Sequence, residues 1–213
     1  PPPRHSSPGS SRSLCKFTMP RRRQPVLVIM NFGCDIVSFF CKISDYRRHQ
    51  HNFMYFCHYK LIRMRIVIQR VLSASVSIEG VLHSSIGRGL LVLVGVENGD
   101  TPDDARWLAD KTAALRIFDD ENGVMNRSIS DIGGEVLSVS QFTLTASTRK
   151  GNRPSYIRAA GHELATSLYN LYTDFVADRL GRTVPTGVFG ADMQVELIND
   201  GPVTIIIDSR LRE

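Results

Sequence analysis

The distribution of charged residues and cysteines changes abruptly at Met64, and this change limits which part of the chain can fold as one domain. Residues 1–63 carry eleven of the 26 Lys and Arg residues but two of the 21 Asp and Glu residues, a net charge of +9. Because the whole chain carries +5, the remainder carries −4, and all four cysteines lie in the first segment. We therefore expect a basic extension over 1–63 and one domain over 64–213.

The extension shows no sustained helical or strand period. Its apolar run is shorter than the roughly twenty residues that a membrane span needs and is interrupted by Asn31 and Asp35, so no membrane helix is expected. An Arg-rich, acid-poor segment leaves an organelle-targeting leader open. We favour the simpler interpretation that the reading frame is over-extended and that the functional start is Met64. The cysteines lack C-x-x-C spacing, so no zinc site is expected.

The residues after Met64 alternate between strand and helix patterns. MRIVIQRV (64–71) predicts a buried strand, residues 74–86 predict a half-buried hairpin that turns at Gly80, and GLLVLVGV (89–96) predicts a fully apolar strand. Thr101 and Pro102, followed by two acidic residues, are typical of a helix start.

Further along the chain, a second helix is expected over about 162–180, ended by Gly181. The sequence also predicts shorter strands at these positions: 124–125, 135–142, 193–198 and 203–207. This order predicts an α+β fold with mainly antiparallel or mixed β-sheets and two principal helices, in a single compact domain.

Standard catalytic motifs are missing from residues 64–213. The sequence holds no G-x-S-x-G, H-E-x-x-H or Walker motif there, and no cysteine. We expect His83 and His162 to be surface residues rather than general bases. No metal or cofactor is expected, and a domain without cysteine fits a reducing, cytoplasmic setting.

Two short segments stand out instead. In SVSQFTLTAS an apolar strand ends in Ser140, Gln141, Phe142 and Thr143, which composition alone would assign to a strand end with hydrogen-bonding side chains. In NDGPVT (199–204) the Gly-Pro pair lies between two strand patterns. Proline within sheets is confined to edges, strand starts and bulges, so the local pattern favours a turn.

Together these segments resemble the D-aminoacyl-tRNA deacylase family. The shared context includes IQRV, ASV, GLLVLVGV and RIF before SQFTL, and RPSY and GADMQV between SQFTL and NDGPVT. The resemblance covers residues 64–207 and nothing in 1–63. It implies a homodimer that acts on the 3′-terminal aminoacyl-adenosine of tRNA. It also implies a cis Gly201–Pro202 peptide that each subunit inserts into the active site of the other.

The resemblance also implies how substrates are selected. Two parallel carbonyl oxygens of the Gly201–Pro202 motif would bind the α-ammonium group of the substrate. The surrounding backbone would then exclude an L-residue, whatever its side chain, and admit a D-residue or glycine. The motif would face Ser140–Thr143 of the partner subunit.

For catalysis, the resemblance implies that the backbone N–H groups of Phe142 and Thr143 hold the oxyanion, while the 2′-hydroxyl of the tRNA assists. Ser140 and Gln141 would shape the pocket around the terminal adenosine. A threonine nucleophile needs an adjacent base, and the motif contains none, so the role of the Thr143 side chain stays open. Because the domain is net negative, we expect a local basic loop to contact tRNA, with these candidates: Arg149, Lys150 and Arg153.

Two alternative functions are weighed against hydrolysis. One is a nucleic-acid-binding accessory protein, because DNA-associated relatives with this fold carry additional tails. Those tails are C-terminal, whereas the Arg-rich segment here is N-terminal. The other is a pseudoenzyme that keeps only the dimer, which intact SQFTL and GPVT segments argue against.

Overall fold

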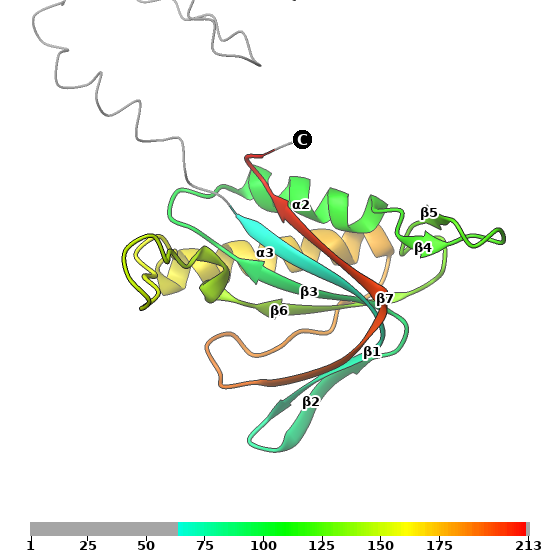
Figure 1. Ribbon diagram of the computed structural model, residues 1–213, viewed down its shortest axis with the longest axis horizontal. Coiled ribbons are helices and arrows are strands. Elements are labelled where there is room, and N and C mark those ends of the chain that lie inside the picture. Colours follow the sequence, from blue (N-terminus) through cyan, green and yellow to red (C-terminus); the bar gives the residue numbers. More distant parts are fainter. Residues whose placement is uncertain (1–63, 212–213) are drawn as a thin grey trace, which may run out of the picture. The chain divides into compact units, whose positions relative to one another are not determined.

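The computed structural model describes residues 64–211 (Figure 1). The expectations for residues 1–63 lie outside the described residues. Within 64–211, neither α-helix combines the length and apolarity that a membrane crossing requires.

The described residues form the strands and helices in nearly the predicted order. They are β1 (Arg65–Ile78), β2 (Val81–Ile86), β3 (Gly89–Gly95), α2 (Pro102–Ala114), β4 (Phe118–Asp119), β5 (Met125–Arg127), β6 (Glu135–Ser140), the 3-10 turn η2 (Phe142–Thr145), α3 (His162–Leu180) and β7 (Gln194–Asp208). Helix α2 begins at Pro102, and α3 ends at Gly181, whose φ is +65°. Both helix positions confirm the prediction.

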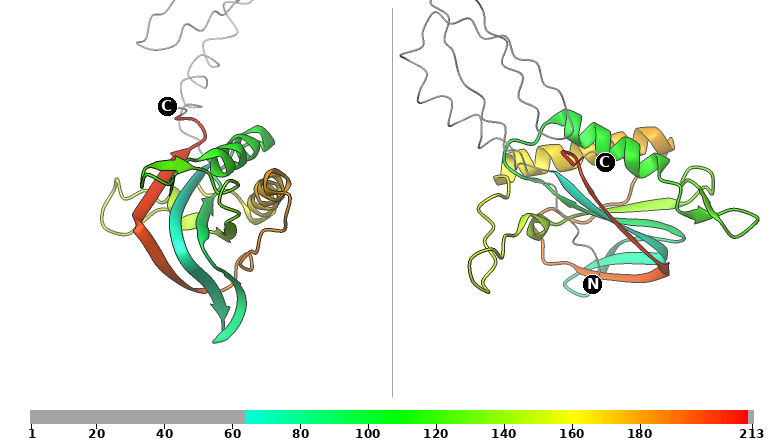
Figure 2. Two further views of the ribbon diagram at one scale, coloured as in Figure 1. Left: turned by 90° about the vertical axis from the view of Figure 1, so that its right-hand side faces the viewer. Right: turned by 45° about the horizontal axis from the view of Figure 1, so that its top comes forward.

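The main sheet has the order β2-β1-β3-β6, and β7 pairs with the long strand β1. Strands β3 and β6 are parallel and the other pairs in this sheet are antiparallel, so the sheet is mixed, as expected. Helices α2 and α3 lie side by side over one face of the curled sheet (Figures 1 and 2). The fold is therefore α+β.

Strand β1 joins what the sequence pattern divides into a buried strand and a hairpin. Its first half, Arg65–Val71, pairs with β3, and its second half, Ala74–Ile78, pairs with β2. The change in apolar pattern reflects a change of neighbour along one continuous strand.

The larger core lies between the sheet and the helices. It contains these side chains among others: Ile66, Ile68, Leu90, Val92, Leu108, Phe118, Leu168, Tyr172 and Val176. Inside it, the hydroxyl groups of Tyr172 and Thr112 lie 2.8 Å apart and join α3 to α2. On α3, Leu164 is 39% exposed, whereas Tyr169 is buried.

The prediction of a turn at residues 199–204 is wrong, because β7 runs through them. Gln69 pairs with Thr204 and Val71 pairs with Asn199, so residues 200–203 form a bulge opposite Arg70. A bulge leaves backbone groups outside the ladder, so proline is tolerated there without loss of a ladder hydrogen bond.

Candidate active site

A cavity of about 440 Å³ lies where the parallel strands β3 and β6 end. Val94 pairs with Ser140 in the last register position of these strands. Ser140, Gln141 and Phe142 all line the cavity, as does Val94. The structure therefore brings three of the four residues of the predicted catalytic segment to one cavity, and Thr143 follows directly behind them.

The turn η2 is anchored at its start and leaves backbone donors there. Gln141 N–H donates to Val94 O over 2.7 Å, and Leu144 N–H donates to Gln141 O over 3.2 Å. The first N–H groups of a helical turn have no intrahelical acceptor. Those groups belong here to Phe142 and Thr143, and they can bind an anionic oxygen.

The Thr143 hydroxyl is held by a neighbouring amide. Gln141 Nε2 donates a hydrogen bond to Thr143 Oγ1 over 2.6 Å. An amide N–H is a donor and cannot take a proton from this hydroxyl. The arrangement places Thr143 without activating it as a nucleophile. Within residues 64–211, no cluster of three or more His, Cys, Asp or Glu residues could hold a metal ion.

Sequence reasoning missed the aromatic residues that line the cavity. Tyr169 and Phe189 line the cavity with ring centroids 6.0 Å apart, and His162 lies 5.1 Å from Phe189. Tyr169 donates its hydroxyl to Ser138 O over 2.9 Å, and burial raises the pKa of Tyr169. His162 is exposed, as expected, and its Nδ1 lies 3.1 Å from Thr166 Oγ1.

The Gly201–Pro202 peptide bond is cis, and both residues are exposed. The buried Arg70 lies beneath them and contacts Asp200, with Nε 3.2 Å from its carbonyl oxygen and 3.1 Å from Oδ2. Gly201 has φ +114°, and a Cβ there would lie 2.9 Å from Arg70 Nη2 and 2.9 Å from Val203 Cγ2. A side chain here would strain the backbone and displace Arg70 or Val203, so glycine is strongly favoured at this position.

Gly201 and Pro202 do not line the cavity of their own chain. Arg70 pairs with Leu90, near the start of β3, whereas the cavity is lined by Val94, near the end of the same strand. Four residues of strand span about 13 Å. Arg70 also donates to Ile117 O over 2.6 Å, next to β4, which lies at the opposite end of the sheet from the segment after β6 (Figure 1).

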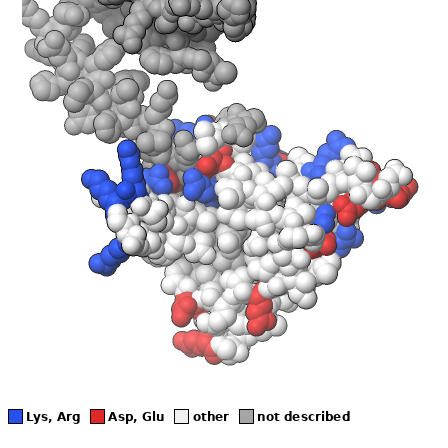
Figure 3. All heavy atoms as spheres, viewed as in Figure 1, with Lys and Arg blue, Asp and Glu red and all other residues white. Residues whose placement is uncertain are grey.

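The predicted basic residues lie on a loop beside η2. Arg149, Lys150 and Arg153 are all exposed, and an antiparallel bridge between Ser147 and Ser155 closes the loop. Figure 3 shows Lys and Arg side chains gathered on this side of the surface. The loop also places Tyr156 against Phe142, whose ring is 58% exposed, with centroids 5.1 Å apart.

A group of buried acids lies behind η2. Glu97 is 2% exposed, and its N–H donates to Asp100 Oδ2 over 2.7 Å. Burial, together with the nearby carboxylates of Asp104 and Glu97, raises the pKa of Asp100 to about 7, although the hydrogen bond from Glu97 N–H acts in the opposite direction. The other oxygen of Asp100, Oδ1, is buried without a hydrogen-bond partner among residues 64–211. A protonated carboxyl suits this position.

Comparison with known proteins identifies relatives that are similar to most of this chain. Residues 67–208 match the family model described as D-Tyr-tRNA(Tyr) deacylase. A D-aminoacyl-tRNA deacylase of Parabacteroides distasonis is 61% identical over 150 residues, which are 70% of this chain and 100% of that protein. A D-aminoacyl-tRNA deacylase of Phocaeicola vulgatus is 59% identical over the same shares of the two chains.

Solved structures share the fold. The c-Myc DNA unwinding element binding protein is 41% identical, with a TM-score of 0.64 over 68% of this chain and 97% of that chain. A probable eukaryotic D-amino acid tRNA deacylase is 17% identical, with a TM-score of 0.61 over 69% of this chain and 100% of that chain. At that identity the second similarity concerns the fold alone.

Proposed function

The chain belongs to the D-Tyr-tRNA(Tyr) deacylase family, and we propose that it hydrolyses the ester between a D-amino acid and the 3′-terminal adenosine of tRNA. The products are the free D-amino acid and tRNA, and glycine mischarged on tRNA is released in the same way. The observation that carries the proposal is the position of Ser140–Phe142 at the cavity, with the first N–H groups of η2 beside it. The reaction needs no cofactor and takes place in the cytoplasm.

The proposed mechanism uses backbone donors and the substrate RNA. Water attacks the ester carbonyl carbon, and the N–H groups of Phe142 and Thr143 bind the oxyanion that forms. The bond to the ribose 3′-oxygen then breaks, and that oxygen takes up the proton that the attacking water gave up. Each preorganised donor of this kind contributes about 3 kcal/mol. The 2′-hydroxyl next to the ester assists, since Thr143 has an amide rather than a base as its neighbour.

The cavity suits the terminal adenosine. Its lining includes the polar residues Ser140 and Gln141 and the aromatic residues Tyr169 and Phe189. A nucleobase offers a flat π-face that packs on aromatic rings and edges that form hydrogen bonds. We assign Ser140 and Gln141 to shaping this pocket.

The chirality filter in this proposal comes from a second copy of the chain. Gly201 and Pro202 are exposed and lie away from the cavity of their own chain. Exposed apolar side chains accompany them on β1 and β7: Leu72 (51%), Ile198 (58%) and Ile206 (65%). The surface in front of β7 shows few charged groups (Figure 3). Such a surface is suited to a homodimer.

The basic loop supplies the proposed contact with the acceptor end of tRNA. Arg149, Lys150 and Arg153 would neutralise phosphates, and the exposed rings of Phe142 and Tyr156 offer a stacking surface for an unpaired base. The three basic residues would attract the tRNA phosphates, which the net negative charge of the domain as a whole repels.

The test is release of amino acid from D-tyrosyl-tRNA, L-tyrosyl-tRNA and glycyl-tRNA by the full chain. We expect fast release from the D-tyrosyl and glycyl substrates and none above background from the L-form. A D-tyrosyl substrate that carries 2′-deoxyadenosine at its 3′ end should react far more slowly. Equal rates with the D- and L-forms would contradict the proposal.

A further inference from the structure

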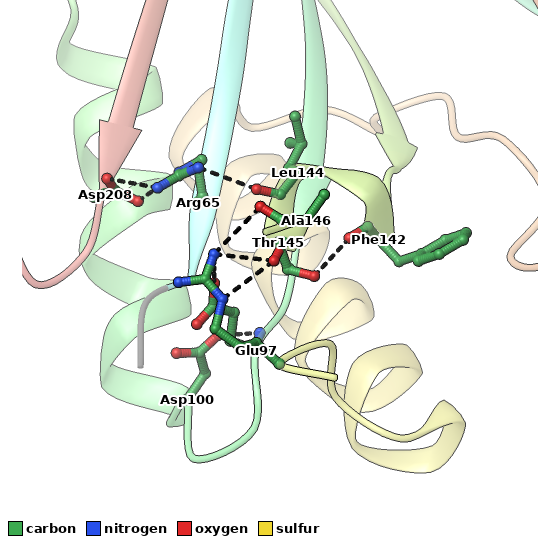
Figure 4. A network of polar contacts seen from close by, with 9 residues as sticks. Arg65, Glu97, Asp100, Phe142, Leu144, Thr145, Ala146 and Asp208 are labelled. Carbon is green, nitrogen blue, oxygen red and sulfur yellow. Dashed lines mark hydrogen bonds and ion pairs between the residues drawn. The ribbon is translucent and has the colours of Figure 1, made fainter. Parts of the chain in front are cut away.

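The carbonyl end of η2 is held by two arginines from distant parts of the chain (Figure 4). Arg65 Nη1 donates to Leu144 O over 3.1 Å. Arg158 donates to Thr145 O from both Nη2 and Nε, over 3.0 and 3.3 Å. The last carbonyl groups of a helical turn lack intrahelical donors, so these bonds complete the turn.

Arg158 is fixed by the buried acid behind it. Its Nη2 lies 3.5 Å from Glu97 Oε1, and the Glu97 side chain is 3% exposed. The Arg158 backbone is fixed to the same segment, because Asn98 N–H donates to Arg158 O over 2.9 Å and Ala160 N–H donates to Val96 O over 3.0 Å. The guanidinium thus joins Glu97 to the carbonyl end of η2.

The two ends of η2 move together because the turn has only four residues. The carbonyl of Thr145 at its end accepts from Arg158, and its opposite end carries the N–H groups of Phe142, which lines the cavity, and of Thr143. A carbonyl oxygen released from the guanidinium would let the whole turn tilt. A shift of about 1 Å in a catalytic group can lower a rate about 100-fold.

We propose that Arg158, held by Glu97, is a positioning residue that sets the direction of the Phe142 and Thr143 N–H groups during deacylation. This rests on the oxyanion-binding role given to those groups in the proposed function. Arg158 touches no reacting atom in this account and acts only through the backbone of η2. Arg65 shares the carbonyl end, but it also pairs with Asp208 of β7 over 2.8 Å, so its loss would disturb the sheet as well.

The test uses full-length Arg158→Gln, which removes the charge, and Arg158→Lys, which keeps it. Because the Arg158 side chain is 37% exposed, both variants should fold. The matched control is Arg182→Gln, since Arg182 Nη1 donates to Gly133 O over 2.9 Å, ahead of β6 and away from η2. Steady-state kinetics on D-tyrosyl-tRNA and amide hydrogen exchange across residues 141–146 are measured for each chain.

For Arg158→Gln we expect kcat to fall by about 10- to 100-fold with KM within about 3-fold of the parent. Exchange across 141–146 should become faster. Arg158→Lys should recover part of kcat, and Arg182→Gln should match the parent.

A kcat near the parent value would overturn the proposal. A rise in KM alone would do so too, and would make Arg158 a contact for RNA. An equal loss in the Arg182 control would show a general effect of removing a surface arginine and would also overturn it. A parent chain that does not release D-tyrosine would refute the proposed function, while the exchange data still decide whether Arg158 orders η2.

Discussion

Gly201 is crowded by Arg70 and Val203, and at the scale of single residues this crowding gives the sharpest test of the proposed chirality filter. In Gly201→Ala, the new Cβ would meet Arg70 Nη2 and Val203 Cγ2 at 2.9 Å, at a φ of +114°. The bulge must shift, which we expect to cost about 1–3 kcal/mol of stability and to misplace the filter. The ratio of D-tyrosyl- to L-tyrosyl-tRNA hydrolysis should fall.

The control for this variant is Gly123→Ala. Gly123 also has a positive φ, +74°, but no atom lies within 4 Å of a Cβ placed there. The control should share the backbone strain and keep the parent's D/L ratio. If both variants keep that ratio, Gly201 takes no part in selection.

Thr143→Ala tests the assignment of catalysis to the backbone and the RNA. Because the hydroxyl accepts a bond from the Gln141 amide and has no base, we expect kcat for D-tyrosyl-tRNA to fall by less than about 10-fold. Removal of a true nucleophile costs about 10⁴-fold or more. A loss of that size, measured by single-turnover kinetics on folded protein, would establish Thr143 as the nucleophile.

At the residue scale, the sequence could predict the segment at the cavity but not its surroundings. Ser140, Gln141 and Phe142 follow an apolar strand, and this local pattern alone predicts only a strand end with polar side chains. The resemblance to the deacylase family is what pointed to these residues as a site. Tyr169 and Phe189 reach the cavity only through the packing of α3 and a distant loop, so no local signal marks them. In the sequence, Arg70 is one charged residue within an apolar strand pattern. Only the structure shows that it is buried opposite the bulge of β7.

At the scale of elements, Asp100 links the end of β3 to the start of α2 and makes this connection sensitive to pH. Burial raises its pKa to about 7, so the unfolded chain releases this proton at lower pH than the folded chain does. Asp100 therefore lowers the free energy of unfolding progressively as pH rises from about 4 to about 7. Above that range the effect is constant.

Asp100→Asn should remove this loss of stability, and its amide oxygen can still accept from Glu97 N–H. We expect equal stability near pH 4 and a variant about 1–3 kcal/mol more stable at pH 8, by urea unfolding at several pH values. Asp131→Asn is the control of opposite sign. The N–H and hydroxyl of Ser128 lower the pKa of Asp131, so its Asn variant should be less stable than the parent above pH 4. A pH-independent difference for Asp100→Asn would contradict this account.

Helices were predicted more accurately than strands because their ends carry local signals. Pro102 and Gly181 mark the start of α2 and the end of α3 by their own backbone preferences. Strand β7 was divided at Gly201–Pro202 because proline cannot donate to a ladder. In the structure, a bulge opposite Arg70 accommodates the proline within the strand. This bulge depends on pairing with β1, so the sequence around Pro202 does not predict it.

At the scale of the whole molecule, the proposed chirality filter requires two copies of the chain. Ile206 is 65% exposed on β7, in the surface proposed to meet the second copy. Ile206→Asp should bury charge in that interface, shift the chain toward monomer in sedimentation velocity, and reduce both hydrolysis of D-tyrosyl-tRNA and its selectivity. Val124→Asp, at a 58% exposed position next to β5, is the control. A monomeric variant with undiminished selectivity would refute the need for a second copy.

A crystal structure of the full chain with a non-hydrolysable D-tyrosyl-adenosine analogue would show directly whether Gly201 and Pro202 act across the subunit interface. We predict that the analogue lies in the cavity beside Ser140–Phe142. Its ammonium group should be within hydrogen-bonding distance of the Gly201 and Pro202 carbonyl oxygens of a second copy. An analogue bound there while Gly201 and Pro202 of every copy face solvent would contradict the account.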